Sequence, residues 1–277
     1  MGSIARGFRL ARASWAVVMQ DRQLLWLPLL SLLASLVVLG VFALGFVGIG
    51  LPDADEDIGP AAYLLGFVLY VVLSFVAIFF NAAVIGAATE RLEGREASIS
   101  IGLALARRHF GQIFVWAVIT ATVGMVLRTI QERAGIFGRI LGGLLGVAWN
   151  AITFFVVPVL LSEPLTATEA IKRSAAIFKE RWGEQFVGNG AIGIAVFLIG
   201  VAVAVPLILV TSVAPVVGIP LLVVAILAVA AAGTACSGVF NAALYRYATT
   251  GDPSGAFSPE DLNASFKPRR GFTGPRA

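Results

Sequence analysis

Charged residues are scarce in this chain of 277 residues: Asp, Glu, Lys and Arg make up 13% of it, whereas 58% of it is hydrophobic. A soluble domain carries about 25% charged residues and roughly 45–50% apolar ones. The mean hydropathy is +0.92. A globule of this size cannot bury so large an apolar fraction, because too much of its surface stays outside. The composition therefore excludes a soluble enzyme, a disordered protein and a nucleic-acid-binding protein, and it indicates that most of the chain lies in lipid.

Reactive side chains are equally few. The chain has one cysteine, Cys236, and one histidine, His109. A single cysteine excludes an intramolecular disulfide, and a single histidine leaves little from which to build a multi-histidine metal site or a catalytic triad. No acidic residue lies inside the long apolar stretches, which argues against a proton-coupled transporter. We therefore expect neither an enzymatic activity nor a cofactor nor a bound metal.

Long apolar runs are what the sequence has in abundance. A helix needs about 20 apolar residues to cross a bilayer. Six stretches reach or approach this length: 24–51, 61–89, 110–127, 140–162, 186–213 and 216–245. Pro28, Pro158 and Pro206 lie inside them and predict kinks, whose freed carbonyl groups should find partners on neighbouring helices. The sequence thus predicts six transmembrane helices.

Basic residues are distributed unevenly between the two sides of this arrangement. Seventeen of the twenty Lys and Arg residues fall in the two termini and in alternate connections, and three fall on the other side. The acidic run 53–57 lies on that second side and is expected to be a solvated turn. Because basic residues are retained in the cytoplasm, both termini are predicted to be cytoplasmic, with the protein in a cell membrane.

An approximate threefold repeat runs along the chain. Each odd-numbered span follows apolar residues at i, i+4, i+7 and i+11, which is one face of a helix. These sets are Ile4, Phe8, Ala11 and Trp15; Ile99, Leu103, Ala106 and Phe110; and Ile171, Ala175, Phe178 and Trp182. Each even-numbered span carries an aromatic residue, Asn and Ala in succession, at 80–82, 149–151 and 240–242. Each Asn is followed 16 or 17 residues later by Ser98, Thr166 or Ser258.

The predicted fold is therefore an all-α integral membrane protein with six transmembrane helices in three hairpins, each preceded by an amphipathic interfacial helix. The repeats cover about 1–96, 97–163 and 164–250, within one transmembrane domain over 1–250. Residues 251–277 are expected to form a cytoplasmic tail, with a short helix from 258 and a disordered end. Thr166 with Glu169, and Ser258 with Asp261, have the spacing of capping boxes.

Asn81, Asn150 and Asn241 are the intramembrane polar candidates. A buried amide in lipid needs a hydrogen-bond partner, and such a bond between helices contributes roughly 0.6–2 kcal/mol. Each Asn therefore either ties its hairpin to a neighbour or lines a path for a small substrate or ion. In either case we expect the side chain to face protein rather than lipid.

The amphipathic helices supply the interfacial candidates, which are Arg9, Trp15, Arg107, Arg108, Phe110, Lys172, Lys179 and Trp182. A basic face beside aromatic residues suits the headgroup region, where each basic residue near an anionic leaflet contributes about 1 kcal/mol. The expected partners are anionic headgroups of the inner leaflet. In the alternative, these faces pack against the bundle or against an unidentified membrane or cytoplasmic protein. No nucleic acid is expected to bind.

A smaller charge cluster, Arg128, Glu132 and Arg133, lies at the predicted outer mouth between spans three and four. Glu132 is placed to pair with either Arg128 or Arg133 across one helical turn. The cluster either receives an anionic group or is a solvated loop.

Three segments resemble parts of a known family: SWAVVMQDRQLLWLPLLS, FFNAAVIGAATERLEG and RSAAIFKERWGEQFVGN. They are similar to a group of uncharacterised prokaryotic six-helix multi-pass membrane proteins, a domain of unknown function. The resemblance covers nearly the whole chain, and the chain is also distantly similar to the membrane domain associated with glycerophosphodiester phosphodiesterases. The resemblance implies a multi-pass membrane protein and supplies no catalytic residues.

Three functions are compatible with these observations. The first is a non-enzymatic membrane module that organises lipid or a partner protein through its basic cytoplasmic-side helices. The second is a small permease or channel with a path lined by the Asn residues. The third is a lipid-modifying membrane enzyme, which has the least support because no nucleophile and base are paired in the sequence.

Overall fold

The computed structural model describes residues 3–49, 59–133, 135–182, 191–252 and 257, and every regular element within them is a helix. In chain order the elements are α1 (Ser3–Gln20), the 3-10 helix η1 (Arg22–Leu25), α2 (Trp26–Ile49), α3 (Pro60–Leu92), α4 (Ile99–Arg108), α5 (Phe110–Arg133), α6 (Gly135–Ile152), α7 (Val156–Ser162), α8 (Ala167–Trp182), α9 (Ala191–Val213) and α10 (Pro215–Thr250). The predicted all-α class is confirmed.

Five helical stretches are long and apolar enough to cross a membrane. They are Arg22–Gly48, Pro60–Leu92, Phe110–Arg133, Phe137–Ser162 and Pro215–Thr250. These five coincide with the predicted spans one to four and six. Large apolar side chains stand exposed along them, for example Leu44 at 74% and Val216 at 87%. Such surfaces are costly in water and suit contact with lipid chains.

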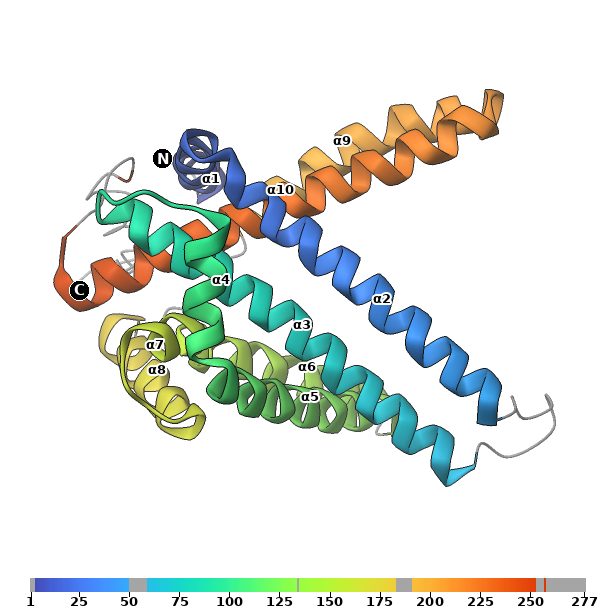
Figure 1. The fold of residues 1–277 in the computed structure, drawn as a ribbon, viewed down its shortest axis with the longest axis horizontal. Coiled ribbons are helices and arrows are strands. Elements are labelled where there is room, and N and C mark those ends of the chain that lie inside the picture. Colours follow the sequence, from blue (N-terminus) through green and yellow to red (C-terminus); the bar gives the residue numbers. More distant parts are fainter. Residues whose placement is uncertain (1–2, 50–58, 134, 183–190, 253–256, 258–277) are drawn as a thin grey trace, which may run out of the picture.

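The predicted fifth span, 186–213, begins among residues outside the described part of the chain. Its described portion is α9, whose apolar stretch Val196–Ser212 is shorter than the other five. Helix α9 lies beside α10 (Figure 1). Pro206 lies inside α9 without ending it. Pro28 needs no kink either, because it lies in the first turn of α2, where backbone amides have no intrahelical partner.

The long helices form three pairs, α2 with α3, α5 with α6, and α9 with α10. In Figure 1 the pairs meet at one end, beside the short helices α1, α4, α7 and α8, and diverge toward the other. We call these the core end and the loop end. Most of the buried apolar side chains belong to the core end, where α3, α7 and α10 contact one another.

Small residues allow α3 and α10 to approach closely at the core end. Residues 82–88 of α3 are all buried. Gly238 of α10 faces Val84, and a methyl group at this glycine would lie 2.5 Å from Val84 Cγ1. Cys236 is buried in the same stretch. Small residues of this kind let two transmembrane helices approach closely.

Capping interactions begin two of the short helices. Ser98 Oγ accepts a hydrogen bond from the Ile101 amide at 3.2 Å and starts α4. Before α8, the Thr166 amide donates to Glu169 Oε2 at 2.9 Å, and the Glu169 amide donates to Thr166 Oγ1 at 3.4 Å. This reciprocal pair confirms the predicted capping box. The other predicted box, at Ser258, and the predicted tail helix lie outside the described residues.

Three of the short helices pack on different parts of the bundle. Helix α4 contacts α3, α8 contacts α7, and α1 contacts α10. Their buried residues include Val18 in α1, Ala106 in α4 and Ile177 in α8. The apolar faces of these helices are therefore turned toward the bundle.

Candidate functional site

Basic and aromatic side chains occupy the outer faces of α1, α4 and α8. Arg9, Arg107, Arg108, Lys172 and Lys179 are all exposed. Trp15 is 40% exposed, and Phe110, at the start of α5, is 51% exposed. The side chain of Trp182 lies outside the described part of the structure. Seven of the eight interfacial candidates are therefore exposed at the core end, and we call these seven residues together the basic surface.

Other basic residues at the core end hold elements together. Arg91 Nε forms an ion pair with Asp21 Oδ2 at 2.9 Å, joining the end of α3 to the start of η1. Arg173 of α8 pairs with Glu163 at 3.1 Å. Glu163 also accepts a hydrogen bond from the Tyr245 hydroxyl of α10 at 3.0 Å. These residues are satisfied within the protein, whereas Arg107, Arg108, Lys172 and Lys179 form no ion pair among the described residues.

His109 lies between α4 and α5 beside this surface. Partial burial lowers its pKa below the ordinary value of 6.5, and the charge of Arg108 lowers the pKa further. His109 is therefore neutral near pH 7, and the positive charge of the basic surface comes from Arg and Lys.

A break between α6 and α7 shows how one of the Asn candidates is used. Pro158 has no amide hydrogen, so the Phe154 carbonyl loses the helical partner it would otherwise have four residues later. Asn241 of α10 donates to this carbonyl through Nδ2 at 3.1 Å. Ser174 of α8 donates to the Ile152 carbonyl at 2.6 Å and accepts from the Phe155 amide at 3.0 Å. The freed groups thus find partners on neighbouring helices, as the sequence predicts for Pro158.

The other two Asn candidates lie elsewhere. Asn81 is half-buried in α3 beside α10, with Oδ1 3.8 Å from where a methyl group at Gly238 would be. Asn150 is exposed to the surroundings of the protein and lines a pocket. This exposure is contrary to the expectation that each Asn side chain faces protein. The three Asn residues therefore do not form one site. Asn241 forms a hydrogen bond between helices, Asn81 lies at the contact between α3 and α10, and Asn150 lines a pocket.

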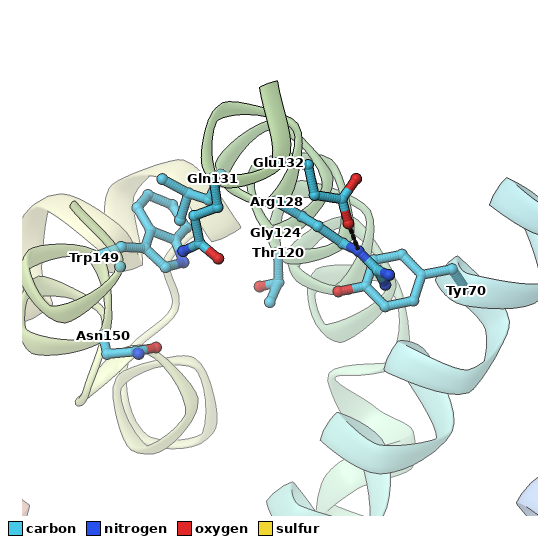
Figure 2. A pocket seen from close by; sticks show the side chains of 10 residues that line it. Tyr70, Thr120, Gly124, Arg128, Gln131, Glu132, Trp149 and Asn150 are labelled. Atoms are coloured by element: carbon cyan, nitrogen blue, oxygen red, sulfur yellow. Dashed lines mark hydrogen bonds and ion pairs between the residues drawn. The ribbon is translucent and has the colours of Figure 1, made fainter. Parts of the chain in front are cut away.

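The pocket beside Asn150 lies between α3, α5 and α6 and has a volume of about 470 Å³. Figure 2 shows Tyr70 on one side, Trp149 and Asn150 on the other, and Thr120 of α5 between them. Trp149 is held in place by stacking on Trp116, with ring centroids 5.9 Å apart. Polar groups from three transmembrane helices thus surround one space.

The predicted outer-mouth cluster borders this pocket. Arg128 Nε donates to Glu132 Oε1 at 2.7 Å, and both residues line the pocket (Figure 2). The predicted pairing across one helical turn is confirmed. Arg133 is exposed and is not among the lining residues. The acidic run 53–57 lies outside the described residues.

Sequence analysis missed Tyr70, Thr120, Gln131 and Ser174. The first three are single polar residues on three turns of apolar helix, and only the pairing of the helices brings them together. A signal for Ser174 did exist: it lies three residues after Ile171, as Gly102 lies three after Ile99. Both positions carry small residues because the backbone of another span lies directly against them. The Ala83 carbonyl lies against Gly102, and the Ile152 carbonyl lies against Ser174.

Comparison with known proteins assigns the chain to a family whose function is unknown. A model of a family of unknown function, DUF6159, matches residues 60–256, which is most of the chain. No curated protein matches the sequence, and no solved structure matches it. The matched region begins at α3 and ends just after α10, so it includes the pocket, two of the three surface helices and all three Asn candidates. The chain belongs to the DUF6159 family.

Proposed function

We propose that this protein is a non-enzymatic membrane module that binds anionic lipid headgroups through the basic surface at its core end. One observation carries the proposal: α1, α4 and α8 bury small and apolar residues against three different parts of the bundle and present Arg, Lys and aromatic side chains outward. Each basic residue near an anionic leaflet contributes about 1 kcal/mol. Trp15 and Phe110 are half-exposed beside these charges, which suits the boundary between headgroups and chains.

The repeat explains why three such helices gather at one end. Gly102 and Ser174 occupy the same position of their repeats, three residues after Ile99 and Ile171. A methyl group at Gly102 would meet the Ala83 carbonyl, and Ser174 donates to the Ile152 carbonyl. These two carbonyls each lie two residues after an Asn of the repeat. Each short helix therefore docks on the even-numbered span of the preceding repeat, and α1 on α10 completes the set.

This cyclic docking supports six spans in three hairpins, with α9 as the fifth span. The distribution of Lys and Arg then puts the core end in the cytoplasm. Reporter fusions test the topology directly. A fusion after Asp57 or Pro215 is expected to read as external, and a fusion after Gly94 as internal. A cytoplasmic signal at Asp57 contradicts the assignment.

The lipid-binding proposal is tested by changing charge at one end at a time. Lys172→Gln with Lys179→Gln removes two exposed charges of the basic surface. Arg133→Gln with Arg139→Gln removes two exposed charges at the loop end and serves as the matched control. The probe is nanodiscs of phosphatidylglycerol and phosphatidylcholine, and the readout is native mass spectrometry of retained lipid.

Two charges contribute up to about 2 kcal/mol, so the first variant is expected to lower the preference for phosphatidylglycerol by as much as about 30-fold. The control is expected to leave the preference unchanged. Binding at the basic surface is contradicted if the preference for phosphatidylglycerol falls equally in both variants, or if it falls in neither. Loss in neither favours the alternative that the basic surface docks an unidentified protein.

The permease alternative draws on a separate observation. Asn150 lines a polar pocket, whereas Asn241 is engaged by the Phe154 carbonyl and Asn81 lies against α10. A path lined by all three Asn residues is therefore less well supported than a pocket that uses one. If a path exists, Asn150→Leu should change permeability, while Asn241→Leu should change stability instead.

A further inference from the structure

The pocket between α3, α5 and α6 extends from the membrane boundary into the hydrocarbon region. Arg128 lies 18 residues after Phe110, which is about 27 Å along a helix and close to the thickness of the hydrocarbon core. Thr120 lies eight residues before Arg128, about 12 Å deeper. Both residues line the pocket. The space is therefore open near the loop end and polar well below it.

Several polar groups of the pocket lining have no hydrogen-bond partner among the described residues. Thr120 Oγ1 is buried and has none. The side-chain amides of Gln131, near the mouth, and of Asn150, which is exposed, have none either. An unpaired hydroxyl at the depth of Thr120 costs several kcal/mol. An occupant that hydrogen-bonds to this hydroxyl would remove that cost.

The charge of the lining restricts what this occupant can be. Arg128 and Glu132 are the charged residues of the lining, and they pair with each other at 2.7 Å. An anion in the pocket would be repelled by Glu132 and would compete with it for Arg128, and a cation would be repelled by Arg128 and would compete with it for Glu132. The groups without partners are instead hydroxyl and amide groups, which both donate and accept hydrogen bonds.

Aromatic rings complete the lining. Tyr70 and Trp149 stand on opposite sides of the space in Figure 2. Gly124 makes room for the Tyr70 hydroxyl, because a methyl group there would lie 2.8 Å from this oxygen. We propose that the pocket binds a neutral polyhydroxyl group, such as a glycosyl or polyol moiety, whose hydroxyls pair with Thr120, Gln131 and Asn150. The group comes either from the head of a glycolipid or from a free sugar.

Two glycines of α6 provide a matched test. Gly146 lines the pocket, and a methyl group at Gly146 would have no atom within 4 Å. Gly143, one turn earlier, has equally open space but does not line the pocket. Gly146→Leu therefore fills the pocket without a clash at Cβ, and Gly143→Leu makes the same chemical change outside it. Asn150→Ala removes one amide of the lining and serves as a second variant if Gly146→Leu does not fold.

The protein is purified in a polyoxyethylene detergent, which carries no sugar, and is placed in nanodiscs that contain phosphatidylglycerol, phosphatidylethanolamine and diglucosyl diacylglycerol. Native mass spectrometry then reports which lipid stays bound. Separately, maltose is added to the detergent-solubilised protein and the shift in melting temperature is measured. Wild type and Gly143→Leu are expected to retain diglucosyl diacylglycerol, and Gly146→Leu and Asn150→Ala are expected to lose it.

A shift with maltose that Gly146→Leu abolishes, without glycolipid retention, identifies a free sugar as the source and also supports the proposal. Retention of phosphatidylglycerol or phosphatidylethanolamine that depends on Gly146 overturns it, because the pocket would then take a charged headgroup. The proposal is also overturned if no probe depends on Gly146, because water alone would then satisfy the polar groups of the lining. None of these outcomes bears on the basic surface at the other end of the molecule.

Discussion

The break between α6 and α7 permits a quantitative test of what holds the bundle together. Ser174 is fully buried and satisfies two backbone groups of the break, the Ile152 carbonyl and the Phe155 amide. Ser174→Ala leaves both unpaired. A buried polar group without a partner costs about 1–3 kcal/mol, so the variant is expected to lose roughly 2–4 kcal/mol of unfolding free energy.

A smaller loss is expected for Asn241→Leu. This change leaves only the Phe154 carbonyl unpaired, and it also removes Asn241 Oδ1, which is itself buried without a partner. Removing an unpaired atom offsets part of the cost. The expected loss is about 1 kcal/mol, within the range measured for hydrogen bonds between transmembrane helices.

Thermal unfolding in detergent, followed by helical circular dichroism, measures both losses. One kcal/mol corresponds to about 2–4 °C for a chain of this size, so Ser174→Ala should lower Tm by roughly 4–15 °C. Ser35→Ala is the control, because the Ser35 hydroxyl bonds only the Ser31 carbonyl of its own helix. If Ser174→Ala shifts Tm no more than Ser35→Ala does, the bonds at the break do not stabilise the fold.

A double-mutant cycle tests the link to Pro158. Pro158→Ala supplies an amide hydrogen four residues after Phe154, where the Phe154 carbonyl can accept it. In the Pro158→Ala background, Asn241→Leu should lower the free energy of unfolding by less than it does in the wild-type chain. A coupling free energy near zero would mean that Asn241 does not compensate for the proline.

Two further predictions concern the short helices. Gly102→Ala should lower Tm, because the added methyl group meets the Ala83 carbonyl. Gly111→Ala is the control and should leave Tm unchanged, because a methyl group there has open space around it. Equal Tm values for the two variants in detergent would contradict direct packing of α4 on α3. His109 has a lowered pKa, so an unfolded chain binds its proton more readily, and stability should fall as the pH drops through 6.5 toward the lower folded value. His109→Phe should flatten this part of the Tm profile between about pH 7.5 and pH 5.5, and a profile identical to that of the wild-type chain would refute the assignment.

The fold class followed from the sequence because lipid imposes a simple rule. Apolar runs of about 20 residues are helices in a membrane, and the five stretches that qualify in the structure lie where hydropathy puts them. The convergence of the pairs at one end could not be predicted in this way. It depends on residues such as Gly238 and Val84, which lie far apart in the sequence and are not distinguished by hydropathy.

The candidate sites were predictable to different degrees. The exposed basic residues of α4 and α8 followed from helical periodicity, because a face with Arg107 and Arg108 opposite Ala106 must turn outward. The role of Asn241 did not follow, since its partner is a carbonyl in the break between α6 and α7, 87 residues away. The pocket was also hidden, because Thr120 and Tyr70 carry no local pattern and meet only when α3 and α5 pair.

The docking of α1 on α10 has a consequence for the order in which the molecule is assembled. Helix α1 is synthesised well before α10, which packs on it and follows about 200 residues later. At 5–20 residues per second a ribosome takes roughly 10–40 s to cover that distance. During this interval Val17 and Val18, which are buried in the finished protein, have no α10 to cover them. The nascent chain must therefore keep α1 on the membrane surface until α10 arrives, and α1 docks on the bundle only then.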